Sequence, residues 1–290
     1  MSVFNDKVVL ITGGARGIGK IMARLALVRG AVVIIWDIDR ELMGHTVTEL
    51  SGYGPVFSYR IDVSSVDDVR TAAKWVRRNV GDVDILINNA AIVAGKYFHE
   101  HDNTDIDRIM SVNAAAPMQI ALEFLPGMLE RNSGHICNVA SSAGLVSNPG
   151  MAVYVASKWA VTGWSDSLRL ELRKLKKKVR VTTVTPYYID TGMFAGVRSL
   201  IPLLKPEKVA LRIISGIERE KVFVSMPWGV RFLRFFQGLL PIWMFDWFVG
   251  NVLGIYRTMD HFTGRIKERA ADEKSAKKTK TLIDGANSDG

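Results

Sequence analysis

Alternation of short β-branched runs with longer helical segments is the feature that most constrains the fold of this chain. Residues 7–12 (KVVLIT) are followed directly by glycines, and residues 18–29 then repeat apolar side chains at helical spacing. Similar runs follow at residues 32–37, 56–61, 85–88, 135–140, 179–185 and 222–225. Strands separated by helices of this length form right-handed βαβ units and a parallel sheet. The pattern predicts an α/β fold, a single doubly wound Rossmann-type domain with a mostly parallel, seven-stranded sheet.

The turn after the first predicted strand is rich in glycine. Residues 12–19 are TGGARGIG, and glycine lets the backbone approach a pyrophosphate without a Cβ clash. The helix that follows adds unpaired N–H groups and the positive end of its dipole. Glycine turns also serve only to connect a strand to a helix, so this motif alone leaves both interpretations open.

Asp37 ends the second predicted strand and favours the dinucleotide interpretation. A carboxylate there accepts hydrogen bonds from both ribose hydroxyls of adenosine and repels a 2′-phosphate. Arg16 in the glycine turn acts in the opposite sense, since a guanidinium can bind that phosphate. We expect NAD(H) to be preferred, because the repulsion by Asp37 acts at the discriminating position, and we leave NADP(H) open.

Two further strand ends extend the expected cofactor site. Asp62 and Val63 follow the third strand, where they can hold the edge and face of an adenine ring. Residues 88–91 (NNAA) end the fourth strand, where a dinucleotide crosses the sheet. The two asparagines, Asn88 and Asn89, are equally suited to tying neighbouring loops together, and the two roles are compatible.

Tyr154 and Lys158 are one turn apart on a predicted helix. A tyrosine with a pKa of about 10 is a poor proton carrier at neutral pH, but a neighbouring ammonium and an oxidised nicotinamide favour its phenolate. Lys158 is also placed to hold the nicotinamide ribose. A tyrosine and a lysine at this spacing are common on ordinary helices, so the surrounding residues must decide.

Those surroundings resemble the short-chain dehydrogenase/reductase family. The glycine turn of that family matches TGGARGIG, and its NNAG stretch matches NNAA at residues 88–91. The family serine matches Ser141 in NVASSAG, and the family's helix asparagine matches Asn113 in SVN. The resemblance covers residues 7–194.

The resemblance implies a role for each of these side chains. Tyr154 is the acid/base group, Ser141 orients the substrate oxygen, and Lys158 binds the ribose and tunes Tyr154. Asn113 supports a water relay from Lys158 to solvent. The implied reaction interconverts a primary or secondary alcohol and a carbonyl by hydride transfer, and it needs no metal.

One departure from the family concerns the segment after the sixth strand. The family commonly has Pro-Gly there, whereas this chain has Pro186 and Tyr187, so the backbone freedom and pocket shape at the nicotinamide face are expected to differ. The continuation through Asp-Thr-Gly-Met-Phe resembles the retinol dehydrogenase and hydroxysteroid dehydrogenase branch. That branch implies a lipophilic substrate of retinoid, steroid or fatty type, with Thr191 on the nicotinamide carboxamide.

The expected contacts follow from these motifs and the resemblance. The cofactor contacts are Gly13, Ala15, Arg16, Gly17, Ile18, Gly19, Asp37, Asp62, Val63, Asn89, Ala90, Tyr154, Lys158, Pro186, Ile189 and Thr191. The substrate contacts are Ser141, Leu145, Val146, Tyr187, Met193, Phe194 and Val197.

The C-terminal part of the chain changes in character. Residues 1–226 are expected to form the dinucleotide-binding and catalytic domain, including a substrate loop at 187–220. Residues 227–262 are crowded with aromatic side chains and are expected to form an apolar helical extension. This extension could cover the substrate, contact a second subunit or rest on a membrane surface. Residues 263–290 are charged and then small and polar, which predicts a loose tail.

Composition narrows the compartment and partners. The formal net charge is +9, but the basic residues are not interleaved with base-stacking aromatics, so no nucleic-acid partner is expected. The single cysteine, Cys137, forms no internal disulfide, and the first residues lack the apolar stretch of a signal peptide. We expect a cytoplasmic homodimer or homotetramer, with peripheral contact to a membrane left open. The alternatives to an enzyme are a catalytically idle dinucleotide sensor and a membrane-surface or partner-binding module on the same fold.

Overall fold

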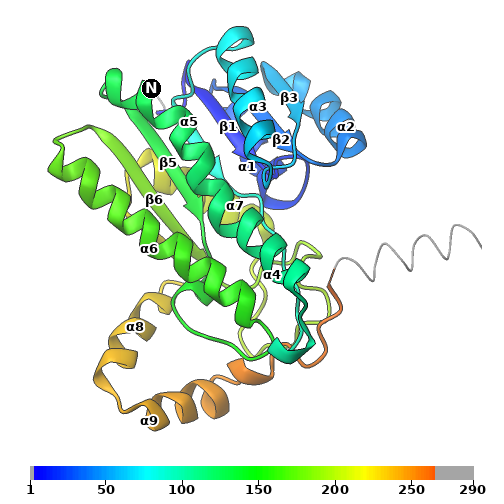
Figure 1. Cartoon of the computed structure of the whole chain (residues 1–290), viewed down its shortest axis with the longest axis vertical. Coiled ribbons are helices and arrows are strands. Elements are labelled where there is room, and N and C mark those ends of the chain that lie inside the picture. The colour runs from blue at the N-terminus through cyan, green and yellow to red at the C-terminus, as the bar shows by residue number, and fades with distance from the viewer. Residues whose placement is uncertain (1–2, 265–290) are drawn as a thin grey trace, which may run out of the picture.

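The structure, a computed structural model that describes residues 3–264, is built on a seven-stranded parallel sheet (Figure 1). Its strand order is β3-β2-β1-β4-β5-β6-β7, and every pairing between these strands is parallel. The strands are β1 Val8–Thr12, β2 Val32–Asp37, β3 Val56–Arg60, β4 Ile85–Asn88, β5 Gly134–Val139, β6 Val179–Pro186 and β7 Phe223–Met226. The predicted α/β fold is confirmed.

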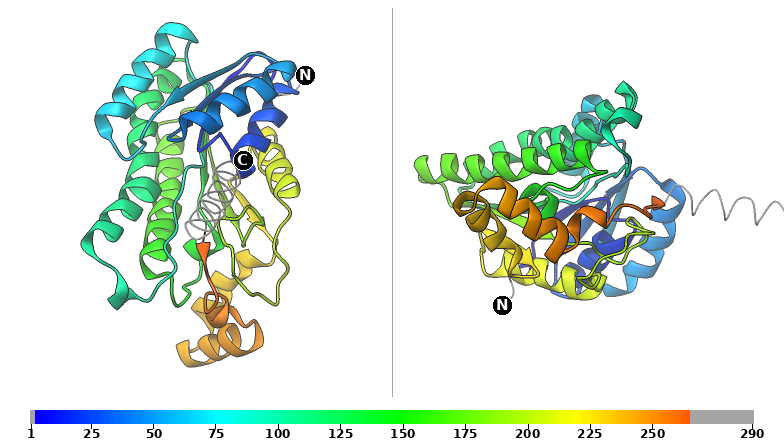
Figure 2. Two further views of the ribbon diagram at one scale, coloured as in Figure 1. Left: turned by 90° about the vertical axis from the view of Figure 1, so that its right-hand side faces the viewer. Right: turned by 90° about the horizontal axis from the view of Figure 1, so that it is seen from below.

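Helices cover both faces of the sheet (Figure 2). One face carries α1 (Gly17–Leu27), α2 (Arg40–Leu50) and α7 (Pro206–Glu218); the other carries α3 (Val66–Asn79), α4 (Asn103–Met110), α5 (Ala116–Glu130) and α6 (Ala152–Lys174). Successive strand residues enter opposite cores: Val9 and Ile11 pack on the α1 side, and Leu10 packs on the α3 side. Burial on both faces explains why the strands are almost continuously apolar.

The strand order reverses between β1 and β4. The chain leaves β1 for a helix on one face of the sheet and leaves β4 toward helices on the other face. Connections that diverge in this way leave a crevice at the carboxyl ends of the strands, which is where α/β proteins bind ligands. The glycine turn follows β1, and residues 88–91 lie at the end of β4, so both motifs meet at this crevice.

The expected substrate loop at 187–220 is wrong in its second half. The structure has helix α7 at Pro206–Glu218, and this helix packs against α1 through Val209 and Ile213. Pro206 occupies the first turn of α7, where its missing N–H costs no hydrogen bond. Within 187–220, only residues before α7 line the pocket at the carboxyl ends of the strands.

The C-terminal extension is helical, as predicted. It contains α8 (Val230–Leu239) and α9 (Ile242–Trp247), followed by a π-helical turn at Phe248–Val252 and a 3₁₀ turn at Ile255–Arg257. The pair α8–α9 projects from the carboxyl end of the sheet (Figure 1). No helix among residues 3–264 is long and apolar enough to cross a bilayer. Of the predicted tail at 263–290, residues 265–290 lie outside the described residues.

Candidate active site

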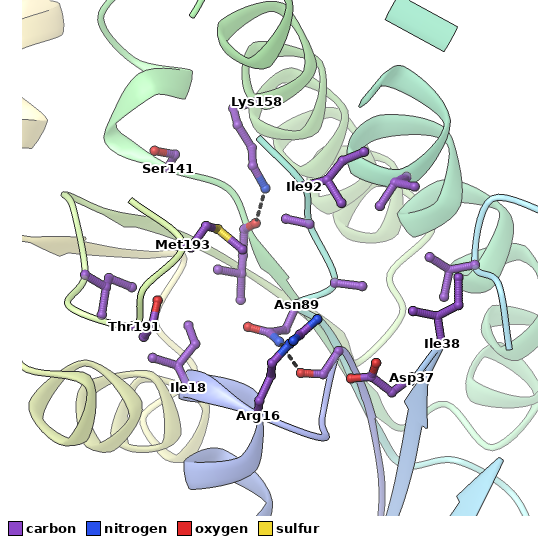
Figure 3. Close-up of a pocket in the computed structure, with 18 of the residues that line it drawn as sticks. Arg16, Ile18, Asp37, Ile38, Asn89, Ile92, Ser141, Lys158, Thr191 and Met193 are labelled. Atoms are coloured by element: carbon purple, nitrogen blue, oxygen red, sulfur yellow. Dashed lines mark hydrogen bonds between the residues drawn. The ribbon is translucent and has the colours of Figure 1, made fainter. Parts of the chain in front are cut away.

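A pocket at the carboxyl ends of the strands brings most of the predicted site residues together (Figure 3). The expected cofactor contacts that line it are Gly13, Arg16, Gly17, Ile18, Asp37, Asp62, Val63, Asn89, Ala90, Tyr154, Lys158, Pro186, Ile189 and Thr191. The expected substrate contacts that line it are Ser141, Tyr187, Met193 and Phe194. We call this space the cofactor pocket.

The structure does not place Ala15 and Gly19 in the wall of the cofactor pocket. Ala15 is 1% exposed, and its backbone N–H donates to Asp37 Oδ2 at 3.1 Å. Gly19 lies behind the wall, where its Cα approaches the Gly13 carbonyl so closely that an added Cβ would lie 2.1 Å from the oxygen. Both residues therefore support the glycine turn from behind.

Hydrogen bonds from the end of β4 hold the glycine turn in place. Thr12 Oγ1 accepts from the backbone N–H groups of Asn89 and Ala90 at 2.9 and 3.0 Å. The Asn89 side chain donates to the carbonyls of Thr12 and Gly13 at 2.9 and 3.1 Å. Gly13 has a φ of +63°, and a Cβ there would lie 3.0 Å from Ala90 Cα. The turn thus needs glycine for its conformation and for its close approach to the next strand.

Asp37 is fixed at the end of β2 with its carboxylate toward the glycine turn (Figure 3). Its Oδ2 accepts from Ala15 N, and its Oδ1 accepts from Asp39 N at 3.2 Å. The side chain is only 7% exposed. Each oxygen accepts one backbone N–H in these bonds, which leaves lone pairs for further donors such as ribose hydroxyls.

Helix α6 carries Tyr154 and Lys158 on one face. The Lys158 ammonium lies 5.6 Å from the centroid of the Tyr154 ring and donates to the Val139 carbonyl at 3.0 Å. Burial lowers the pKa of Lys158 to about 8. No second acceptor for this ammonium is recorded among residues 3–264, so two N–H donors remain for hydroxyls of a bound molecule.

Burial raises the pKa of Tyr154 above its ordinary value, although a hydrogen bond with Ser141 acts in the lowering direction. Tyr188 adds a smaller raising effect. Desolvation of the phenol is the largest effect on this pKa in the protein without a dinucleotide. Tyr154 is therefore a protonated phenol at neutral pH and can donate a proton. The tuning of Tyr154 by Lys158 was expected together with an oxidised nicotinamide, and it stays a prediction.

The depressed pKa of Lys158 predicts a stability that depends on pH. The unfolded lysine has a pKa of 10.5 and the buried one a pKa of about 8. Between these values the unfolded chain binds more protons, so the free energy of unfolding rises with pH. Between pH 8 and pH 10.5, the free energy of unfolding of the unmodified protein should rise by roughly 1–3 kcal/mol relative to that of Lys158→Met. Urea denaturation without dinucleotide, at a series of pH values, measures the difference.

An exposed lysine provides the control for this measurement. Lys174 is at the end of α6 and is solvent-exposed, so the difference between Lys174→Met and the unmodified protein should not change with pH. A Lys158→Met difference that is equally flat would contradict a buried ammonium with a depressed pKa.

Asn113 lies in a π-helical turn, Ser111–Ala115, and is only 1% exposed. Its Oδ1 accepts from Ile92 N at 2.8 Å, and its Nδ2 donates to Ile92 O and to Ser157 Oγ at 2.9 and 3.1 Å. Ser157 Oγ in turn donates to the carbonyl of Tyr154 at 2.7 Å. Asn113 thus connects the turn that bears Tyr154 to the loop after β4, and it does not line the cofactor pocket.

A second space, which we call the apolar cavity, continues from the same residues. Ser141, Tyr187 and Phe194 line both the cofactor pocket and this cavity. The far wall of the cavity comes from the C-terminal extension, including Val230 and Leu233 of α8. The cavity therefore connects the alcohol-bearing side chains of the site to the apolar helices.

Three of the expected substrate contacts are placed differently. Val146 lines the apolar cavity but not the cofactor pocket. Leu145 packs with Phe245 and Val249 in a buried cluster, and Val197 packs on a neighbouring cluster; neither lines the cofactor pocket or the apolar cavity. Adjacency in sequence was the only basis for these two, and the chain turns their side chains inward.

Tyr187 fits where the family commonly has glycine. Its φ is negative, so the backbone does not need glycine, and its N–H donates to the Met226 carbonyl at 2.8 Å. Its hydroxyl is hydrogen-bonded to Ser199 Oγ at 2.8 Å. Tyr187 is only 6% exposed, and it lines both the cofactor pocket and the apolar space that is lined by Val230 and Leu233.

Several functional contacts were missed from the sequence. Thr12 and Ser157 act through hydrogen bonds to other residues. Both had a positional signal, since Thr12 opens the predicted glycine motif and Ser157 lies three residues after Tyr154. Further residues that line the cofactor pocket are Trp36, Ile38, Ile61, Ser64, Ile92, Arg108, Val112, Val139 and Ala140, beside Ala91 of the predicted NNAA stretch. Most of them flank predicted contacts at strand ends, so strand-end position could have identified them.

Comparisons with known proteins agree with this geometry. A family model described as short chain dehydrogenase matches residues 7–200. Epidermal retinol dehydrogenase 2 of Mus musculus is 35% identical over 269 residues, which are 90% of this chain and 87% of that protein. Estradiol 17-beta-dehydrogenase 11 of Pongo abelii is 34% identical over 238 residues, which are 81% of this chain and 79% of that one.

Solved structures give the same result. A short-chain dehydrogenase/reductase from Burkholderia phymatum in complex with NAD superposes with a TM-score of 0.75 at 27% identity, covering 82% of this chain and 96% of that one. A metagenomic short-chain oxidoreductase in complex with NADP gives a TM-score of 0.66 at 29% identity, covering 77% and 95%. The chain therefore belongs to the short-chain dehydrogenase family, in its retinol and hydroxysteroid branch, and is a nicotinamide-dependent oxidoreductase acting on CH–OH groups.

Proposed function

We propose that the protein is an NAD(H)-preferring dehydrogenase or ketone reductase for a lipophilic substrate of retinoid, steroid or fatty type. The apolar cavity carries this proposal, because it starts at Ser141 and is walled by Val230 and Leu233 of the extension. Relatives named for retinol and estradiol, both lipophilic alcohols, support the same substrate class. In this proposal residues 1–226 bind cofactor and perform catalysis, and residues 227–262 complete the substrate site.

The proposed roles follow from the geometry of four side chains. Ser141 and Tyr154 hold one substrate oxygen between their hydroxyls, and Tyr154 donates its proton to a carbonyl oxygen or takes it back from an alcohol. The free N–H donors of Lys158 bind ribose hydroxyls. Asn113 acts as a positioning residue through Ser157 and supports the proton relay. The nicotinamide, when bound, supplies the hydride-transfer chemistry.

The preference for NAD(H) depends on the carboxylate of Asp37. Asp37→Ser should narrow the preference over NADP(H) by about tenfold or more, because it removes a negative charge from the position of the 2′-phosphate. Specificity constants with both cofactors measure the change. Asp37→Asn keeps an acceptor for Ala15 N and should have the same effect. Equal use of both cofactors by the unmodified protein would show that Arg16 outweighs Asp37.

The apolar cavity predicts a dependence on substrate length. Each methylene removed from water contributes about 0.8 kcal/mol, so specificity constants should rise severalfold for each of the first added carbons in a series of ketones. Leu233→Ser should flatten this rise because Leu233 lines the cavity. Leu239→Ser is the matched control on the same helix, since Leu239 is 63% exposed. A flat series with the unmodified protein would refute a lipophilic substrate.

The oligomeric state and the compartment stay predictions. We infer a cytoplasmic homodimer or homotetramer, and light scattering of the purified full chain would test the assembly.

A further inference from the structure

The outward side of α8 and α9 is covered by large apolar side chains that remain exposed. Trp228, Phe235, Leu239, Ile242, Trp243 and Trp247 form this surface, which we call the aromatic face; each is at least 61% exposed, and Ile242 is 78% exposed. Contiguous apolar surface of this kind marks an interaction site in a folded protein.

The aromatic face is not needed to seat the two helices on the protein. Phe245 and Val249 already bury the inner side of the extension against Leu145 and Val146. Val230 and Leu233 fill the wall of the apolar cavity. Because the inner side alone provides the packing, the exposed aromatics are available for a partner outside the described chain.

A basic hollow adjoins the aromatic face. It is lined by Arg212, Arg219, Lys221 and Arg231 together with Trp228. The guanidinium of Arg231 lies 5.8 Å from the Trp228 ring and 4.9 Å from the Phe232 ring. The hollow and the aromatic face are thus one continuous surface, joined at Trp228 and Arg231.

The acidic residues beside this surface in the sequence have partners of their own. Glu218 is paired with Arg29, and Glu220 is paired with Arg180. Asp246 accepts a hydrogen bond from Tyr256 Oη at 2.7 Å. No acidic residue occurs between Pro227 and Phe245 in the sequence. The surface therefore combines exposed aromatic rings with cations that are not neutralised by the carboxylates beside them.

We propose that the aromatic face and the basic hollow dock the protein on an anionic phospholipid bilayer. Tryptophan and phenylalanine insert at the boundary of headgroups and acyl chains, and cations beside them bind anionic headgroups. A second copy fits this surface less well, because a two-fold contact would set one basic hollow against the other. Docking does not depend on the proposed substrate, but it brings the helix that lines the apolar cavity to the lipid.

Vesicle flotation of the purified full chain tests the proposal. The protein should float with vesicles of phosphatidylcholine and phosphatidylglycerol and much less with phosphatidylcholine alone. Phe235→Ser combined with Trp243→Ser should reduce partitioning at least about tenfold. Arg212→Glu and Arg219→Glu should each reduce binding to anionic vesicles about fivefold or more.

Matched controls separate docking from a loss of folding or a general charge effect. Leu122 is 71% exposed on α5, and Lys174 is exposed at the far end of α6; Leu122→Ser and Lys174→Glu should float like the unmodified protein. Each variant should keep its melting temperature and its turnover of a short, water-soluble ketone. If the aromatic double variant does not fold, the two charge reversals, at exposed positions, decide the outcome.

Three results would overturn the proposal. The unmodified protein could fail to float with either vesicle, or the aromatic and charge variants could float as well as it does. Light scattering could instead show a dimer that the aromatic variants convert to a monomer while no vesicle binding occurs, which would identify a second copy as the occupant. If the unmodified protein turns over the ketone but does not float, docking fails and the proposed function stands. If it floats but does not turn over any ketone, the proposed function fails and docking stands.

Discussion

Tyr154→Phe is expected to lose about two to four orders of magnitude in turnover while binding the dinucleotide as tightly as the unmodified protein. The substitution removes the only proton that Tyr154 can transfer and leaves the ring in place. The ring is 4% exposed and packs edge-on against Phe194 at 6.1 Å, so packing is retained. Steady-state turnover and dinucleotide affinity, measured by fluorescence titration, give the two quantities.

Tyr188→Phe is the matched control for this prediction. Tyr188 is also a buried phenol, hydrogen-bonded to Asn148 and Thr258 at 2.8 and 3.0 Å, but the proposal gives it no proton to transfer. Removal of the Tyr188 hydroxyl should lower the melting temperature and leave turnover close to that of the unmodified protein. If Tyr154→Phe kept wild-type turnover, or if both variants lost it equally, Tyr154 would not be the acid/base group.

The sequence predicted the sheet because strand and helix have different apolar periods in this chain. β2 and β4 begin and end where expected, and the remaining strands differ by one or two residues at their ends. Site residues could also be predicted from the ends of strands. Asp37 was predicted from its position at the end of β2 and Asn89 from its position at the end of β4, and both line the cofactor pocket. Local pattern was sufficient here, because parallel strands place their carboxyl ends at one edge.

Features that depend on tertiary contacts could not be predicted in this way. The direction of the Tyr154 pKa shift depends on how completely the phenol is buried, which the spacing to Lys158 does not reveal. The aromatic composition of the extension is visible in the sequence. The sequence does not reveal that α8 places Leu233 in the wall of a cavity and Phe235 in solvent. Both outcomes require knowledge of which elements meet in space.

Gly19→Ala is expected to abolish measurable dinucleotide binding and to destabilise the protein by about 1–3 kcal/mol. An alanine Cβ would lie 2.1 Å from the Gly13 carbonyl oxygen and 2.8 Å from Asn89 Nδ2. The backbone oxygen cannot rotate away, so the glycine turn or the start of α1 must move. That movement breaks the bonds from Asn89 to Thr12 and Gly13, which hold the phosphate-binding turn against β4.

The same substitution elsewhere on a helix should have the opposite effect on stability. Gly163 is on α6, and a Cβ added there would meet nothing within 4 Å; Gly163→Ala should therefore stabilise the protein by about 0.5–1 kcal/mol and leave dinucleotide affinity unchanged. Urea denaturation and fluorescence titration of the two variants measure both effects. Normal dinucleotide affinity in Gly19→Ala would mean that the turn tolerates displacement, and that its contact with Gly13 does not shape the phosphate site.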